Sequence, residues 1–179
     1  MNTYNLIAQT VGIFAMAFNI ISYQQKTRKM AIACQLGGSI LFAINFFMLG
    51  ATVGGILNTL GIIRALVFLN KEKIKAEHPL WLAGFTTAYI LSYVLTFTVL
   101  GKEPTLFNFV IELLPVIGMI STTISFRLTD AKSIRRYGLI SSPSWLIYNI
   151  ANFAIGAIIC EVLSLGSIIL GIIRLDRKK

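Results

Sequence analysis

Four polar or aromatic residues in the last third of the chain could bind a small polar molecule. Trp145, Tyr148, Asn149 and Asn152 are spaced i, i+3, i+4 and i+7, so they share one face of a helix. A ring beside amides suits a sugar, because the ring stacks on C–H faces while the amides bond to hydroxyl groups. The same set could instead anchor a helix at a membrane interface and hold it against its neighbours. Both interpretations stay open.

Glu112 is the one acidic residue that lies clearly inside an apolar run. A charged side chain at the centre of a membrane costs roughly 2.5 to 3.5 kcal/mol on insertion scales, so such residues usually serve a function. Glu112 could bind a proton that is coupled to transport. It could equally be a neutral, hydrogen-bonded residue or face a watery vestibule.

The residues of enzyme and metal sites are scarce in this chain. The single histidine, His78, lies in a hydrophilic segment, and the two cysteines, Cys34 and Cys160, are far apart in the sequence. One histidine and two distant cysteines do not make a zinc site, and no glycine-rich phosphate loop with a lysine is present. We therefore predict no enzyme activity, no cofactor and no metal.

The elements that must position these side chains are membrane-spanning helices. The chain has 179 residues, of which 56% are hydrophobic and 13% charged, and its mean hydropathy is +0.77. A span needs about 20 residues, so seven spans would use most of the chain and leave no separate soluble domain. The apolar runs predict an all-α membrane protein with helices at about 5–23, 30–49, 53–69, 80–100, 105–126, 137–157 and 158–175.

An internal repeat relates the two ends of the chain. Ile21-Ser22-Tyr23 returns as Ile124-Ser125-Phe126, and after a shift of seven residues Gly61-Ile62-Ile63-Arg64 returns as Gly171-Ile172-Ile173-Arg174. We predict two three-helix repeats, 1–69 and 101–179, the second including a basic tail. The loop and linker helix at 70–100 would make the repeats parallel, as in one class of transporters.

The repeat also bears on the candidate site residues. Phe42 and Asn45 in the first repeat form a thinner version of the face that carries Trp145 and Asn149, so Asn45 joins the candidate substrate contacts. Glu112 is matched by Gln9, which weakens the case for a proton site.

The positions of the basic residues predict the orientation in the membrane. The net charge is +9, and every Lys and Arg except Lys102 lies in three alternate turns, at the adjoining helix ends or in the tail. Because basic residues resist translocation, we place these turns and the C-terminus in the cytoplasm and the N-terminus outside. We assign Arg64 and Arg174, at cytoplasmic helix ends, to contacts with lipid phosphates. The partner of this charge is then the lipid bilayer and not nucleic acid.

The basic turn after the first helix of each triplet resembles the PQ-loop and SWEET superfamily. The whole chain is more closely similar to the YgjV family of bacterial inner membrane proteins, from the opening helix through Ser22-Tyr23-Gln24-Gln25-Lys26-Thr27 to Gly171-Ile172-Ile173-Arg174. The Pro-Gln pair of the PQ-loop pattern is replaced by Tyr23-Gln24 and by Phe126-Arg127.

The SWEET resemblance implies roles for three further residues. Asn58, in the middle of the third helix, would contact substrate, although an asparagine there can also simply join helices. Pro115 and Pro143 would act as hinges, while the matching positions in the first repeat hold Gly12 and Ile40. Only the second half would therefore bend in that way.

These observations favour a SWEET-like transporter in the bacterial inner membrane. It would carry a small polar, sugar-like solute by alternating access, contacted by some of Asn58, Trp145, Tyr148, Asn149 and Asn45. The alternative is a non-transporting scaffold or receptor that keeps the fold and binds another protein, because the Pro-Gln turns and the first-half prolines are missing. A homo-oligomer stays open in either case.

Overall fold

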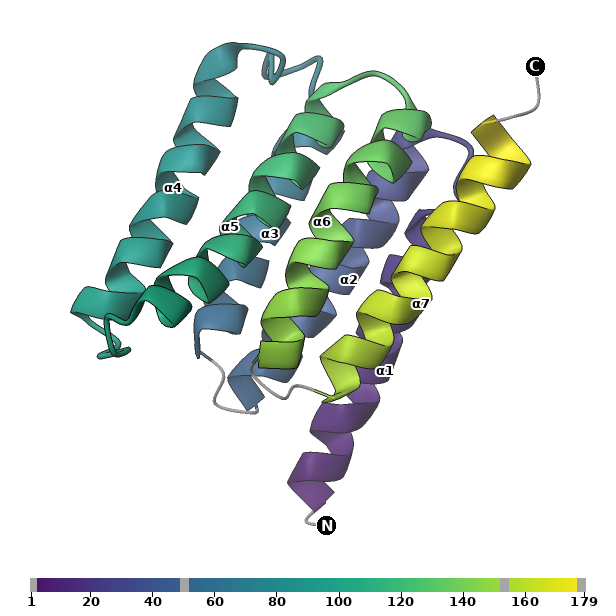
Figure 1. Cartoon of the computed structure of the whole chain (residues 1–179). Coiled ribbons are helices and arrows are strands. Elements are labelled where there is room, and N and C mark those ends of the chain that lie inside the picture. Colours follow the sequence, from purple (N-terminus) through teal and green to yellow (C-terminus); the bar gives the residue numbers. More distant parts are fainter. Residues whose placement is uncertain (1–2, 49–51, 152–154, 177–179) are drawn as a thin grey trace.

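The computed structural model describes residues 3–48, 52–151 and 155–176. These residues form seven α-helices, a short π-helix and no β-strand. The elements are α1 (Thr3–Ser22), α2 (Arg28–Met48), α3 (Thr52–Leu69), α4 (Pro79–Thr98), α5 (Leu106–Arg127), α6 (Ala131–Ala151), α7 (Ile155–Gly171) and η1 (Ile172–Asp176). Consecutive helices run in opposite directions, and the two ends of the chain lie at opposite ends of the bundle (Figure 1).

The helices have the apolar surface of a membrane protein. Four segments are long and apolar enough to cross a membrane by length and composition, namely Arg28–Met48, Pro79–Thr98, Leu106–Arg127 and Gly156–Asp176. Two shorter apolar helices cover Leu6–Ser22 and Gly54–Leu69. Large apolar side chains are exposed on all seven helices, whereas many polar ones are buried. This distribution is the reverse of that in a water-soluble protein.

The helices pack as two groups of three with α4 at one edge. Helix α2 packs against α1 and α3, and α6 packs against α5 and α7. The groups meet where α1 contacts α7, α2 contacts α6 and α3 contacts α5. Helix α4 contacts only α5 and α3 closely and stands at the edge of the bundle (Figure 1). The predicted repeat and the orientation in the membrane stay predictions.

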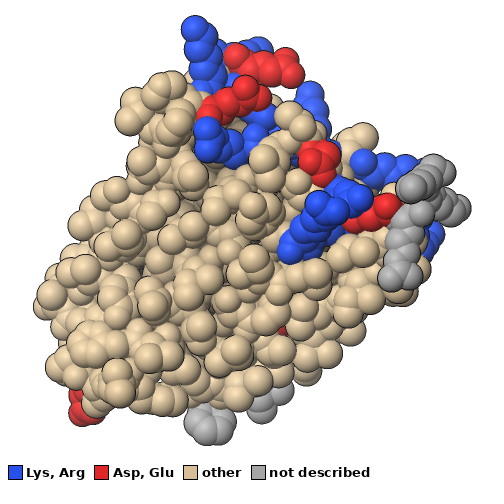
Figure 2. Space-filling model, turned by 45° about the horizontal axis from the view of Figure 1, so that its top comes forward, with Lys and Arg blue, Asp and Glu red and all other residues tan. Residues whose placement is uncertain are grey.

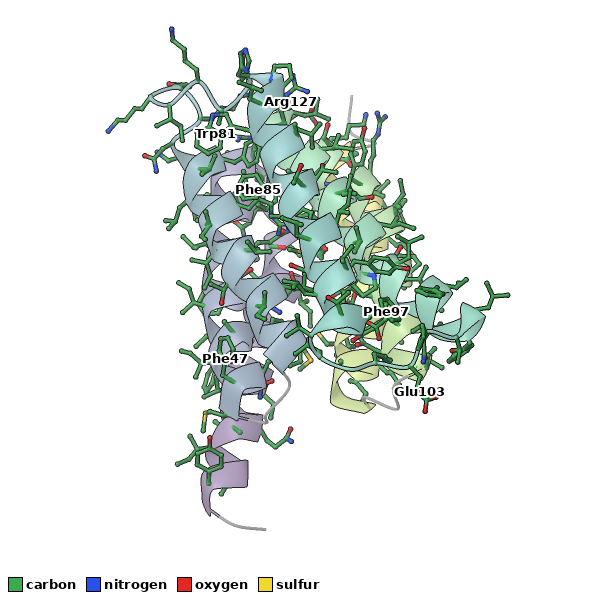
Figure 3. All side chains as sticks on the ribbon, turned by 90° about the vertical axis from the view of Figure 1, so that its left-hand side faces the viewer. Phe47, Trp81, Phe85, Phe97, Glu103 and Arg127 are labelled. Atoms are coloured by element: carbon green, nitrogen blue, oxygen red, sulfur yellow. The ribbon has the colours of Figure 1, made fainter. Side chains whose placement is uncertain are left out.

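Aromatic residues fasten α4 to the bundle. Trp81, Phe85 and Tyr89 follow one another at i, i+4 spacing, and the ring of Phe85 lies 6.2 Å from that of Phe68 on α3. The Tyr89 hydroxyl is hydrogen-bonded to the Thr123 hydroxyl on α5 at 3.0 Å. Trp81 and Phe85 lie at the end of the bundle that carries Arg127, and Phe97 lies toward the end that carries Glu103 (Figure 3).

The charged residues gather at one end of the molecule. Figure 2 shows the Lys and Arg side chains over the turns at this end, with a few acids among them, while the sides are almost free of charge. We call this the basic end. It is formed by the α1–α2, α3–α4 and α5–α6 turns and by η1 (Figure 1).

The sixth helix departs most from its predicted range. The prediction of 137–157 was wrong at both ends, because α6 runs from Ala131 to Ala151. Asp130 explains the early start: its Oδ1 accepts a hydrogen bond from the Ser133 N–H at 2.7 Å and its Oδ2 accepts one from the Ser133 hydroxyl at 2.9 Å. Such a side chain replaces the missing partners of a helix N-terminus. The charged residues before residue 137, which predicted a turn, therefore belong in part to α6.

The last helix changes its geometry before it ends. α7 is α-helical to Gly171 and continues as the π-helix η1. A π-helix has wider turns than an α-helix, so the residues after Gly171 point in new directions. Asp176 is thereby brought to Arg135 on α6, with which it forms a buried ion pair.

Candidate functional site

A polar cavity of about 120 Å³ lies between the two groups of helices. Every helix except α4 contributes to its wall. The lining side chains that carry a polar atom are those of Asn19, Tyr23, Gln35, Ser39, Asn58, Arg64, Thr122, Ser141, Ser142, Trp145, Asn149 and Glu161. We call it the central cavity.

The structure brings three of the five predicted substrate contacts together. Asn58 on α3 and Trp145 and Asn149 on α6 all line the central cavity, although α3 and α6 belong to different groups. Asn45 lines an adjoining cavity, and Tyr148 is not part of either wall. Asn152, the fourth member of the predicted face, lies outside the described residues.

Asn58 has hydrogen-bonding capacity left for a ligand. Its Nδ2 donates to the Gly54 carbonyl of its own helix at 2.9 Å, which holds the side chain but joins no other helix. The Asn149 side chain is buried and makes no hydrogen bond to the described residues. Buried amides are normally hydrogen-bonded, so these two groups can bind water or a polar solute in the cavity.

Trp145 is placed by a close approach of two helices. A Cβ atom added to Gly118 on α5 would lie 2.9 Å from both Cδ1 and Nε1 of the Trp145 ring. The ring also meets Tyr148 edge to face, with centroids 5.9 Å apart and an interplanar angle of 89°. Trp145 therefore contacts the cavity on one side, while Tyr148 supports its ring.

Asn45 lines the second cavity, of about 390 Å³, which is formed by α1, α2 and α7. Its Nδ2 donates to the Ala8 carbonyl at 2.7 Å, and a Cβ on Gly12 would lie 3.1 Å from that nitrogen. Asn45 thus joins α2 to α1. The second cavity shares Phe42, Phe46, Ala157 and Cys160 with the central cavity and lies toward the end opposite the basic end.

Glu112, the predicted proton site, is buried on α5 and ion-paired with Lys102 of the α4–α5 turn. It lies outside the walls of both cavities. Pro115 and Pro143, the predicted hinges, lie within α5 and α6. A proline removes one backbone hydrogen bond from a helix, so both helices have a weak point.

Two ionisable residues of the central cavity were missed by the sequence analysis. Arg64 is only 5% exposed and lines the cavity, so its assignment to lipid phosphate was wrong. Glu161 lies inside α7, and its carboxylate accepts a hydrogen bond from the Ser142 hydroxyl, so Glu112 is not the only acid within a helix. The apolar neighbours of Arg64 were a signal that could have revealed it.

The basic end of the central cavity is closed by reciprocal contacts between the two groups. Arg28 on α2 donates from Nε and Nη2 to the Phe126 carbonyl at 2.9 and 2.6 Å. Arg135 on α6 donates from Nη1 to the carbonyls of Tyr23 at 3.4 Å and of Gln25 at 2.9 Å. Tyr23 and Phe126 are matching positions of the predicted repeat, so each group binds the same place on the other.

Neutral side chains extend this closure. The Gln24 amide donates to the Ser167 carbonyl at 2.6 Å and to its hydroxyl at 2.9 Å, and that hydroxyl donates to the Ile20 carbonyl at 2.7 Å. Lys71, in the α3–α4 turn, donates to the Arg127 carbonyl at 2.8 Å and pairs with Glu77. The hydrogen bond from Lys71 holds the pKa of the Glu77 carboxyl below its ordinary value.

Metal binding has no support among the described residues, where no group of three or more His, Cys, Asp and Glu side chains could hold an ion.

Neither a curated protein nor a solved structure matches this chain. The family model Imp-YgjV, described as a bacterial inner membrane protein, matches residues 6–179. With its apolar helices and its buried polar interior, the chain belongs to this family of bacterial inner membrane proteins.

Proposed function

We propose that this protein is a carrier, not an enzyme, and that it moves a small polar solute across the bacterial inner membrane by alternating access. The observation that carries the proposal is the polar central cavity between two groups of helices. Asn58 and Asn149 reach it from different groups with unused hydrogen-bonding capacity. Polar groups facing such an internal cavity are typical of substrate pathways in membrane proteins.

A carrier that works by alternating access is closed at one end and accessible from the other in each of its states. The two ends of the central cavity differ in this way. Arg28, Arg135 and Gln24 close the basic end by hydrogen bonds between the groups. Toward the opposite end the central cavity adjoins the second, larger cavity. Rocking of one group against the other, with bending at Pro115 and Pro143, would break the contacts at the basic end and open the alternate path.

The size of the central cavity bears on the solute. A cavity of about 150 Å³ holds one benzene ring of six carbon atoms, so a cavity of about 120 Å³ accepts roughly five non-hydrogen atoms. A six-carbon sugar is larger and would need the cavity to widen. The proposed solute is therefore smaller than the sugar that the Trp145 face predicts.

Osmotic light scattering on proteoliposomes tests the proposal without a labelled substrate. Vesicles are shrunk in glycerol, small sugars, amino acids or organic acids, and the rate of reswelling measures entry of each solute. We expect at least one solute to enter faster than into protein-free vesicles. Asn58→Ala should slow this entry at least tenfold, because the amide binds the solute from within the membrane.

Asn70→Ala is the matched control. Asn70 also donates from Nδ2 to the carbonyl four residues earlier, at 2.9 Å, but it is exposed at the end of α3 and outside both cavities. Its replacement should leave the rate unchanged. Equal entry in Asn58→Ala and the parent protein would remove Asn58 from the path, and no entry of any solute would favour the scaffold or receptor alternative.

A further inference from the structure

Arg64 is a buried cation without an anion. It lies on α3, about 7 Å along the helix from Leu69 at the basic end, and is 5% exposed. No carboxylate of the described residues lies within 4.0 Å of it. An arginine stays charged in a protein, and a buried, uncompensated charge is strongly unfavourable.

The partners that Arg64 does have are weak. Nη1 lies 3.4 Å from the Met119 carbonyl and 3.5 Å from its sulfur, Nε has no hydrogen-bond partner, and the guanidinium sits 5.0 Å from the centroid of the Phe126 ring. A ring face attracts a cation but offers no lone pair. The fork of N–H groups that binds a carboxylate bidentately is therefore available at the wall of the central cavity.

Glu161 is the complementary group. It lines the same cavity from α7, in the other group of helices, and its carboxyl has one partner, the Ser142 hydroxyl. No Lys or Arg side chain of the described residues is paired with it. One cavity thus holds an unpaired cation and an unpaired acid that do not pair with each other.

We propose that the solute of this cavity is a small zwitterion, with one carboxylate for Arg64 and one ammonium group for Glu161, of the size of glycine, alanine or serine. The assignment rests on the transport function proposed above. A volume of about 120 Å³ fits a solute of about this size. A solute with only one charge would leave either Arg64 or Glu161 unpaired in the cavity.

The zwitterion also suits a carrier. Its two charges would bridge α3 and α7, which belong to different groups, so that a bound solute holds the two groups together. Its net charge is zero, so its passage does no work against the membrane potential. Asn58 and Asn149 are left to donate to the second lone pairs of the carboxylate oxygens or to bind a hydroxyl group.

Calorimetric titration of the purified protein in detergent tests this with matched probes. L-alanine carries both charges, propionate lacks the ammonium group, ethylamine lacks the carboxylate, and glycerol lacks both. We expect alanine to bind at least tenfold more tightly than each of the other three. If propionate binds as tightly as alanine, the cavity is a simple anion site and the zwitterion proposal is wrong. The proposal is also wrong if alanine, glycine and serine all fail to bind.

Two variants assign the charges. Glu161→Gln should lower the affinity for alanine at least tenfold and remove the preference for alanine over propionate. Arg64→Gln should remove the preference for alanine over ethylamine. These ratios are measured within one variant, so a general change in folding does not affect them. The matched controls Arg174→Gln and Glu103→Gln change exposed residues outside both cavities, so both variants should keep both preferences. Unchanged preferences in Arg64→Gln and Glu161→Gln would overturn the assignment of the charges.

Counterflow of labelled alanine in proteoliposomes separates this inference from the proposed function. Binding that depends on Arg64 and Glu161 without counterflow would leave the zwitterion site in place and reject transport. Reswelling in glycerol that depends on Asn58, with no binding of alanine, would leave transport in place and reject the zwitterion.

Discussion

Gly118 shows how a single residue decides the shape of the central cavity. It faces Trp145 across the α5–α6 contact, and a Cβ at this position would come within 2.9 Å of the indole ring. The indole ring lies against Gly118 and meets Tyr148 edge to face, so it could avoid the added atom only by moving into the central cavity. The glycine is therefore required by the ring and not by the conformation of its own backbone.

Gly118→Ala tests this close approach. We expect the variant to lose about 1 to 3 kcal/mol of stability, as for other overpacked cores, measured as a lower thermal unfolding midpoint in detergent. Gly84→Ala on α4 is the control, because nothing lies within 4 Å of its added Cβ. That change should be neutral or stabilising by up to about 1 kcal/mol, since alanine is the better helix former. Equal midpoints for the two variants would contradict the placement of Trp145.

Arg64 and Arg174 show the limit of inference from residue type. Both end the repeated sequence Gly-Ile-Ile-Arg, but apolar residues follow Arg64, whereas Arg174 is followed closely by charged residues. Arg64 is buried at the cavity on a regular α-helix, whereas Arg174 is exposed on the π-helix η1. The second arginine thus lies on a segment of different helix type, in which Asp176 is ion-paired with Arg135 on α6.

At the scale of the elements, the apolar runs predicted seven helices, and six of them lie close to their expected ranges. A run of about 20 apolar residues in a membrane must form a helix, because its backbone polar groups have no other partner there. The sixth helix was misplaced because its first turns carry Lys132, Arg135 and Arg136. Arg135 is ion-paired with Asp176, and Lys132 and Arg136 are exposed, so none of the three charges requires a loop.

Asp130→Ala tests the start of α6. Loss of the hydrogen bonds to Ser133 should cost about 0.5 to 2 kcal/mol, while Asp130→Asn, which keeps a capping oxygen, should cost less. Burial raises the pKa of the Asp130 carboxyl, but the bonds from Ser133 outweigh it and hold the pKa below its ordinary value.

The sign of the pH effect follows from that depressed pKa. The contribution of Asp130 is present at neutral pH and is lost as the pH falls through the folded-state pKa. Thermal unfolding midpoints between pH 7 and pH 3 should therefore fall more steeply for the parent protein than for Asp130→Ala. Parallel curves would show that Asp130 does not cap the helix.

At the scale of the whole molecule, the basic turns do two things. They mark one end of the bundle with positive charge, as expected at the cytoplasmic side (Figure 2). With the helix ends beside them, they also supply Gln24, Arg28 and Arg135, which join the two groups of helices. The second role depends on residues more than 90 positions apart, so no local pattern contains it.

Gln24→Ala tests whether these contacts close the cavity. Two lost hydrogen bonds at about 1 kcal/mol each would raise the population of a state open at the basic end roughly thirtyfold. Cys160, buried at the junction of the two cavities, is the reporter. In a Cys34→Ser background, its labelling by a membrane-impermeant thiol reagent in inside-out vesicles should accelerate.

Gln25→Ala is the control for this experiment. The Gln25 amide donates only within its own half, to the Ile21 carbonyl at 3.1 Å, so its loss should leave the labelling rate of Cys160 as it is in the parent protein. The same acceleration in both variants would mean that the turn itself, and not the bond from Gln24 to Ser167, holds the end closed.

The sequence by itself determined the class of the protein, its membrane location and nearly all of its helices, because these follow from hydrophobicity and backbone hydrogen bonding along the chain. It also identified Asn58, Trp145 and Asn149, since their side-chain chemistry is independent of the fold. Only the tertiary structure decided that these three face one cavity, that Asn45 joins two helices instead, and that Arg64 and Glu161 share that cavity unpaired. The rotation of each helix about its axis is fixed by packing between distant segments, and an all-round apolar helix carries little periodic signal from which to predict it.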